Sequence, residues 1–195
     1  GGGPGSSESS SQSLVSRGSR SSEVTGSVLG RFTRVLGGGG RAAMLAEIRL
    51  ISKLRHPNIT TVMGAVLEKG NEMLVMELME NGSLRDLLSN ETVAIEGELL
   101  HPIVKDICQG MRFLHSATPP IVHGDLKAAN VLVDSTMRAK VADFGLSTRR
   151  RARVQDGSPF WMAPELLVAK GGFTTQSDVY AYGITLFEIF SREYP

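Results

Sequence analysis

The octapeptide HGDLKAAN at residues 123–130 places the carboxylate of Asp125, the ammonium group of Lys127 and the amide of Asn130 on one short segment. A second carboxylate, Asp143, follows a hairpin turn further along the chain. Transfer of a phosphoryl group requires a base or orienting group for the acceptor hydroxyl, positive charge beside the transferred oxygens, and oxygen ligands for Mg²⁺. Asp125 suits the first task and Lys127 the second. Asn130 and Asp143 suit the third, so the spacing predicts magnesium-dependent phosphoryl transfer.

Further motifs stand in a fixed order around this segment. LRHPNI (residues 54–59) precedes it, and DFG (143–145), APE (163–165) and SDVYAYGITLFEI (177–189) follow it. Taken alone, HGDLKAAN could equally be an Asx-type turn on a surface loop. In this order, the set resembles the catalytic loop, the metal-binding loop and the end of the activation segment of a eukaryotic protein kinase.

The resemblance covers residues 41–195. Within the kinases, this segment is most similar to the tyrosine-kinase-like group of serine/threonine kinases. Lys127, two positions after Asp125, resembles the serine/threonine-specific pattern, and GSPFWMAPE at residues 157–165 resembles that group. The implied activity is transfer of the γ-phosphate of ATP, with Mg²⁺, to Ser or Thr hydroxyls of a protein substrate. The implied fold is α+β: a protein-kinase-like two-lobe fold with an incomplete small β lobe and the N-terminal half of the helical large lobe.

The resemblance also implies roles for residues outside these motifs. Met76 would guard the back of an adenine pocket and Leu132 would form its floor. Glu77 and Met79 would offer backbone hydrogen bonds to adenine, and Asp178 would hold the catalytic loop from the last helix.

Glu47 matches the helix glutamate that, in the family, pairs with a strand lysine at the α- and β-phosphates. No lysine precedes Lys53 in the chain, however. GSVLG at residues 26–30 is at best a partial match to the family's glycine-rich loop. Without the family pattern, Glu47 would be read as a solvated helix charge. Gly124 also replaces the arginine that normally receives an activation-loop phosphate, so we expect either that activity is not switched through that anchor or that the arginine run at residues 149–153 substitutes for it.

Hydrophobic periodicity and turn residues predict the elements that must position these groups. Helices are expected over residues 41–55, 83–88, 99–115 and 178–190, and strands over 60–67, 72–78, 121–123, 131–133 and 140–141. The last helix is apolar nearly all round, which predicts burial in a larger core.

The domain organisation follows from composition for residues 1–40 and from the resemblance for the remainder. Residues 1–40 contain 11 Gly and 11 Ser, which predicts a disordered tail. A few apolar residues between positions 24 and 36 could add a strand or short helix to it. Residues 41–79 are expected to be a remnant of a kinase small lobe that ends in the hinge. Residues 80–195 are expected to be a large lobe that lacks its last helices.

The overall composition indicates a soluble intracellular chain. The 195 residues carry 21 Lys and Arg against 20 Asp and Glu, which gives no reason to expect a nucleic-acid partner, and no apolar run is long enough to span a membrane. The single cysteine, Cys108, excludes an internal disulfide framework and a cysteine metal cluster. We therefore expect a cytoplasmic location, with Cys108 as a small core residue; the oligomeric state is not predicted.

The sequence leaves two functions of different classes open. One is the serine/threonine kinase, which the intact catalytic loop and DFG favour. The other is a catalytically impaired, pseudokinase-like or truncated interaction module, which the missing lysine and glycine-rich loop favour. A small-molecule phosphotransferase is a weaker third reading, because APE and the segment after it resemble elements that bind protein substrates.

Overall fold

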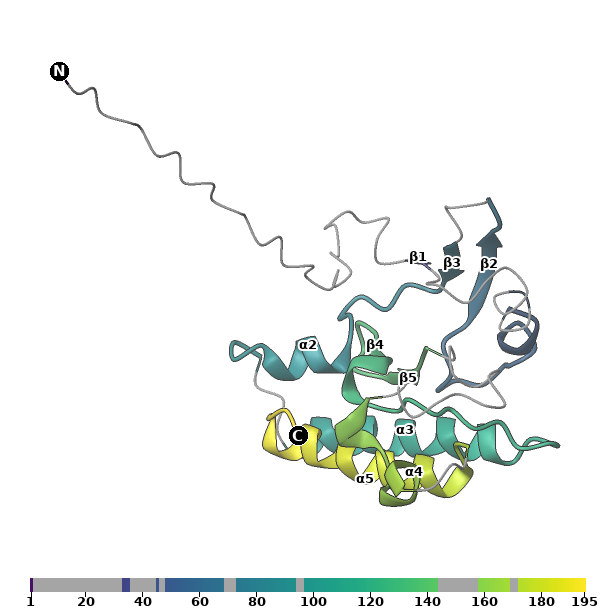
Figure 1. Cartoon of the computed structure of the whole chain (residues 1–195). Coiled ribbons are helices and arrows are strands. Elements are labelled where there is room, and N and C mark those ends of the chain that lie inside the picture. Colours follow the sequence, from purple (N-terminus) through teal and green to yellow (C-terminus); the bar gives the residue numbers. More distant parts are fainter. Residues whose placement is uncertain are drawn as a thin grey trace.

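The computed structural model describes residues 1, 33–35, 45, 48–68, 73–93, 97–143, 158–168 and 172–195. A small antiparallel sheet lies above a hairpin, and helices lie below that hairpin (Figure 1). The strands are β1 (Thr33–Val35), β2 (Val62–Val66), β3 (Met73–Met76), β4 (Val131–Val133) and β5 (Ala139–Val141). The helices are α2 (Leu84–Ser89), α3 (Leu100–His115), α4 (Pro164–Val168) and α5 (Thr175–Ser191), with short 3₁₀ turns η2 (Gly97–Leu99), η3 (Ala128–Asn130) and η5 (Pro159–Trp161).

The small sheet has the strand order β1-β3-β2, and both pairings are antiparallel. Strand β1 lies inside the segment that composition predicts to be a tail. Its pairing partner, β3, lies some forty positions further along, so the apolar residues between positions 24 and 36 left a strand or a short helix open but could not indicate its partner. The remainder of residues 2–40 lies outside the described part of the chain.

Most other elements are confirmed with shifted ends. Helix α3 begins one residue later than predicted, and β2 and β3 are shorter than the predicted strands. Thr60 is not part of β2, because both its amide and its hydroxyl donate to the carbonyl of Val141 in β5. The helix predicted to reach residue 55 ends at Ile51, where tighter turns bring Lys53 and Leu54 back onto the preceding carbonyls.

The prediction of a strand at residues 121–123 is wrong. The amide of Ile121 donates to the end of α3, and the amide of His123 donates to the side chain of Asp178 on α5. These two donors are used by a helix end and a carboxylate, and residues 121–123 belong to neither of the sheets among the described residues.

Helix α5 begins at a capping box, in which Thr174 and Ser177 each accept the other's backbone N–H. The prediction that this helix is buried all round is wrong. Ala181, Thr185 and Ile189 are buried, whereas its other side exposes Val179, Tyr180, Phe187 and Phe190. In the described structure, the hydrophobic core covers one side of α5 only.

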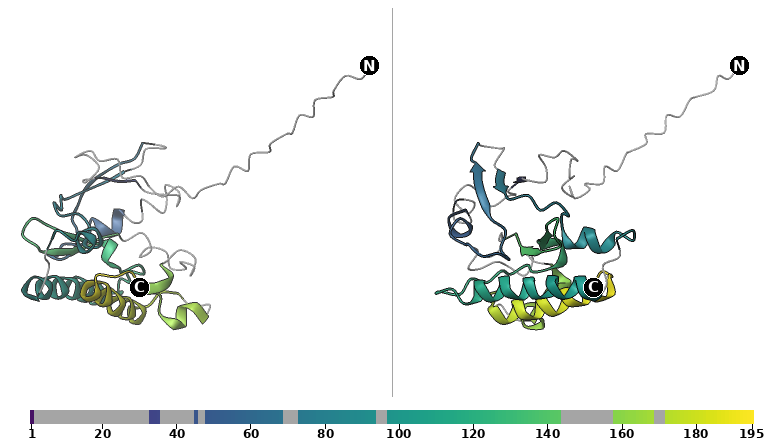
Figure 2. Two further views of the ribbon diagram at one scale, coloured as in Figure 1. Left: turned by 90° about the vertical axis from the view of Figure 1, so that its left-hand side faces the viewer. Right: turned by 180° about the vertical axis from the view of Figure 1, so that it is seen from behind.

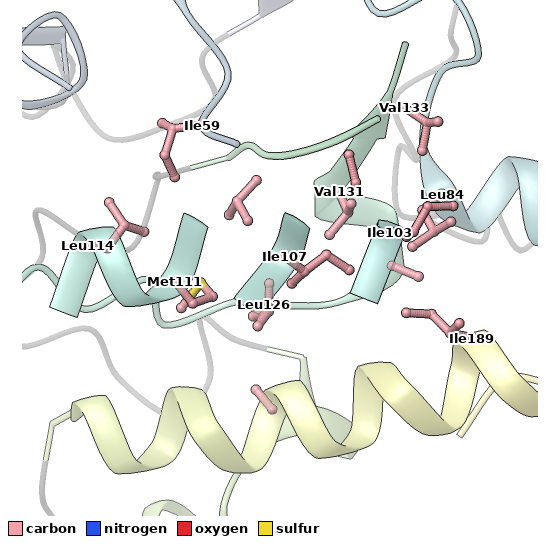
Figure 3. Close-up of a cluster of buried hydrophobic side chains, with 14 of the residues drawn as sticks. Ile59, Leu84, Ile103, Ile107, Met111, Leu114, Leu126, Val131, Val133 and Ile189 are labelled. Carbon is pink, nitrogen blue, oxygen red and sulfur yellow. The ribbon is translucent and has the colours of Figure 1, made fainter. Parts of the chain in front are cut away.

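The core lies where α3, α5 and β4 meet, and α3 runs beside α5 beneath the β4–β5 hairpin (Figure 2). Ile103, Ile107 and Leu114 of α3 are completely buried. Ile103 and Ile107 lie between Val131 of β4 and Ile189 of α5, whereas Leu114 lies toward the other end of α3, on the side of Ile59 (Figure 3).

Two residues of α3 show how closely the helix approaches its neighbours. A Cβ at Gly110 would lie 2.6 Å from the backbone oxygen of Asn58, so no larger residue fits there without a shift. Cys108 is exposed, which corrects the prediction of a core position: it lies on the solvent side, next to buried Ile107. None of the helices that the structure describes has the length and apolar character needed to cross a membrane.

Candidate active site

The structure brings three of the predicted catalytic and metal-binding residues together in the loop before β4. The side-chain amide nitrogen of Asn130 donates to the Asp125 backbone carbonyl at 2.7 Å and to Asp125 Oδ2 at 2.9 Å. Lys127 Nζ lies 3.0 Å from the same Oδ2 atom. The turn of η3 brings Asn130 back to the start of the loop, so the carboxylate has a fixed position beside a cation.

Ser158 is a member of this cluster that the sequence did not place there. Its hydroxyl donates to Asp125 Oδ1 at 2.8 Å and accepts from Lys127 Nζ at 2.7 Å. The only sequence signal for it is its position in GSPFWMAPE. A seryl hydroxyl therefore already contacts the carboxylate predicted to orient the acceptor hydroxyl.

Asp178 anchors the loop from α5, as its position in the motif set predicts. Its carboxylate accepts from the backbone amides of His123 and Gly124, each at 2.9 Å, and it contacts His115 Nε2 at 2.8 Å. Asp178 is buried, so these contacts satisfy a carboxylate that would otherwise be costly to bury. His115, at the end of α3, was not expected in this network.

Gly124 has a φ of +80°, in the left-handed region that favours glycine. An arginine there would adopt the same conformation only at a cost in backbone strain. The residue type that distinguishes this loop from the usual pattern therefore suits the backbone geometry of the anchored turn.

The predicted metal ligands lie on neighbouring segments. The amide of Ala142 donates to the Asn130 carbonyl at 2.9 Å, and the Ala142 carbonyl lies 2.8 Å from His123 Nε2. Asp143 therefore directly follows a residue whose backbone is bonded at both ends to the segment at residues 123–130. Because the Asn130 amide nitrogen is engaged by Asp125, its oxygen is the atom available to a metal.

An amide oxygen and a carboxylate fit Mg²⁺, which prefers oxygen ligands and often completes its shell with water and phosphate. Among the residues that the structure describes, no group of three or more His, Cys, Asp or Glu side chains could hold a metal ion by itself. The donor set thus fits a cation bound together with a phosphate ligand rather than a metal site built from protein groups alone.

The residues predicted to surround adenine lie at the end of β3, directly after it, or on β4. Met76 and Asp143 line the same small cavity of about 10 Å³, together with Leu74. Leu132 is half-buried and alternates with the buried side chains of Val131 and Val133 along β4. It therefore lies on the face of β4 that is turned away from the core.

Backbone hydrogen bonds within the chain determine which backbone groups of Glu77 and Met79 are left for a ligand. The amide of Glu77 donates to the carbonyl of Thr61, and the carbonyl of Met79 accepts from Gly82. A ligand would therefore meet the Glu77 carbonyl and the Met79 amide as the groups not used in these two bonds.

The side chain of Glu77 forms a bridge that sequence reasoning missed. Its carboxylate accepts from Lys140 Nζ on β5 and from the backbone amide of Thr61, both at 2.6 Å. Partial burial alone would raise the pKa of Glu77, but the hydrogen bonds from Lys140 and Thr61 outweigh it and lower the pKa below its ordinary value. The pair ties the segment after β3 to the β4–β5 hairpin.

Glu47 lies outside the described residues, and its predicted role stays a prediction. In the small sheet, the ladder register places Arg34 of β1 opposite Leu74 of β3. Leu74 is one of the residues that line the cavity with Asp143.

These motifs and their geometry agree with a comparison against known proteins. Residues 37–195 match the family model described as protein tyrosine and serine/threonine kinase. The chain therefore belongs to the protein kinase family, and its fold is a partial two-lobe kinase fold.

Individual relatives agree in family but differ in named specificity. The chain is 42% identical over 152 residues to the probable serine/threonine-protein kinase drkD of Dictyostelium discoideum, covering 76% of this chain and 12% of that protein. It is 38% identical over 161 residues to the dual specificity protein kinase shkC of the same organism, covering 79% and 32%. It is 44% identical over 161 residues to the tyrosine-protein kinase csk-1 of Caenorhabditis elegans, covering 80% and 29%. The chain thus spans less than a third of the length of each.

Proposed function

We propose that this chain is a protein serine/threonine kinase that transfers the γ-phosphate of Mg·ATP to Ser or Thr hydroxyls of a protein substrate. The observation that carries this proposal is the contact of a seryl hydroxyl with Asp125 Oδ1, bridged by Lys127 Nζ. A substrate hydroxyl of the same kind fits the same carboxylate and cation.

Each group has a task in this reaction. Asp125 accepts the hydrogen bond of the acceptor hydroxyl and orients its oxygen. Lys127 places positive charge beside the oxygens of the transferred group. Asn130 and Asp143 would hold Mg²⁺, which neutralises phosphate charge when it is bound. Asp178 and Gly124 keep the loop in the conformation that aligns these groups.

The nucleotide would lie between β3 and β4. The Glu77 carbonyl and the Met79 amide would bind the adenine edge, with Met76 behind it and Leu132 below it.

The experiment is thermal unfolding of the chain with and without Mg·ATP, followed by transfer assays on matched peptides with a single Ser, Thr or Tyr. Nucleotide at a hundredfold excess over its dissociation constant adds about 2.7 kcal/mol to stability, which raises the midpoint by roughly 5–10 °C for a chain of this size. Asp143→Asn should remove the increase that depends on magnesium. Transfer to Ser and Thr but not Tyr would support the specificity.

A second candidate, a catalytically impaired interaction module, is favoured by the absence of a lysine before Lys53. It predicts a cooperative unfolding transition that does not respond to Mg·ATP, and no transfer to any of the three peptides. That outcome would contradict the kinase proposal.

A further inference from the structure

A groove runs along the solvent side of α3, next to the turn that joins β4 to β5. It has a volume of about 620 Å³, and its lining includes Glu98 of η2, Lys105 and Asp106 of α3, and Arg138 directly before β5. None of its lining residues belongs to the candidate active site. The proposed kinase function therefore gives this groove no task.

Arg138 is held on one wall of the groove by a buried carboxylate. Its Nε and Nη2 atoms donate to the two oxygens of Asp106 at 2.7 Å and 2.6 Å, and the amide of Ala139 donates to the same carboxylate at 3.0 Å. The Asp106 side chain is buried, whereas that of Arg138 is 55% exposed. The guanidinium therefore has a fixed position, and its Nη1 atom, which these bonds do not use, is left for a ligand oxygen.

Helix α3 adds positive charge on the other side of the groove. Lys105 lines the groove, and Arg112 follows seven positions later, which is about two helical turns and places both on one face. Both side chains are exposed. Near the C-terminal end of α3, the ring of His56 stacks on Phe113 with a centroid distance of 4.8 Å. This contact brings the segment that carries the exposed Arg55 to the same surface.

The carboxylates described in the groove offset only part of this charge. Asp106 is buried and is engaged by Arg138, so its negative charge is compensated within the wall. Glu98 is exposed, but it lies just before α3 begins, at the far end of the helix from Arg112. A ligand with several negative charges is therefore attracted to the middle and the C-terminal half of α3.

We propose that this groove binds an acidic segment of a partner protein, whose carboxylates contact Lys105, Arg112 and Arg138. A polypeptide fits better than a nucleic acid, because no Phe, Tyr or Trp for base stacking is among the described lining residues. The inference goes beyond the proposed kinase function and does not depend on it, since these residues take no part in binding nucleotide or the acceptor hydroxyl.

The test measures the binding of fluorescent peptides to the whole chain by anisotropy. Three peptides of equal length are compared, in which Ala alternates with Glu, with Gln or with Lys. We expect the Glu peptide to bind about tenfold more tightly than the Gln peptide, and this difference to shrink as the salt concentration rises. The Lys peptide should bind no more tightly than the Gln peptide.

Charge reversal locates the binding surface. Lys105→Glu and Arg112→Glu should each remove most of the preference for the Glu peptide, and Glu98→Gln should increase it. Because Lys105 and Arg112 are exposed, both variants should keep the unfolding midpoint of the chain. The matched control is Arg49→Glu, which reverses an exposed cation in the helix that ends at Ile51 and should leave binding unchanged.

Three results would overturn the proposal. One is equal binding of the Glu and Gln peptides. Another is a loss in Arg49→Glu as large as that in Lys105→Glu, which would indicate attraction to the overall charge rather than to the groove. The third is a single-stranded DNA of the same net charge that binds more tightly than the Glu peptide and is released by Lys105→Glu. None of these measurements requires ATP or transfer, so the kinase proposal can fail without affecting them.

Discussion

The catalytic loop and the small sheet are held in place by different means. The loop is anchored by buried polar side chains from α5. Asp178 accepts from the backbone amides of His123 and Gly124. Glu188 accepts from the backbone amide of Ala128 and from the indole N–H of Trp161. The small sheet has three short strands, and Met63 in β2 is 72% exposed. Its connection to the hairpin includes the partly exposed pair of Glu77 and Lys140. The position of the loop that would orient the hydroxyl is therefore fixed by more buried contacts than the position of the small sheet that would cover the nucleotide.

The largest expected effect is on the anchored side. Asp178→Ala leaves the amides of His123 and Gly124 without their acceptor in a buried position, which costs about 3–5 kcal/mol of unfolding free energy. Urea denaturation of the two proteins measures the difference. A change below about 0.5 kcal/mol would mean that the loop does not depend on this carboxylate.

The second-largest expected effect is the loss of a buried apolar side chain from the core, compared with the loss of an exposed one from the small sheet. Leu114→Ala deletes a completely buried side chain between α3 and its neighbours and should cost about 2–5 kcal/mol. Met63→Ala in the small sheet should change stability by no more than about 0.5 kcal/mol. Thermal and urea unfolding compare the pair, and equal losses would contradict the assignment of the core to α3, α5 and β4.

A smaller effect is expected at Gly124. Gly124→Ala forces a side chain into a conformation with φ of +80° and should destabilise the chain by about 1 kcal/mol. The matched control is Gly64→Ala in β2, where an added Cβ meets no atom within 4 Å and φ is not in the left-handed region. If the two substitutions gave the same unfolding midpoint, the strain argument for Gly124 would be lost.

The smallest effect concerns the link between the regions. The Glu77–Lys140 pair is partly exposed, so Glu77→Gln and Lys140→Met should each cost at most about 1 kcal/mol, and a double-mutant cycle should show coupling. The folded-state pKa of Glu77 lies below its ordinary value of 4.5, so the stabilisation is present above that pH and is lost as the pH falls through the folded-state pKa. Urea denaturation between pH 7 and pH 3 should show the chain losing more stability than Glu77→Gln. Parallel curves would exclude the contribution.

Much of the site could be predicted because its motifs are local. Asp125, Lys127 and Asn130 lie within six positions, so a short turn is sufficient to bring them together. Ser158 and Glu188 could not be predicted as members of the active-site surroundings. They lie 31 and 60 positions from the loop residues they contact, and nothing in their local sequence states which partner they will meet.

The fold shows the same division. Helix α3 was predicted nearly to its ends because its apolar residues repeat with the helical period, and that period is a property of the sequence alone. Strand β1 was left open as a strand or a short helix, and the irregular segment at residues 121–123 and the one-sided burial of α5 were not predicted, since each depends on what packs beside it. The sequence by itself determined the family and the extent of helix α3. Only the tertiary structure decided which carboxylates anchor the loop and which aromatic rings stay exposed, because burial and hydrogen-bond partners across long chain separations are set by packing.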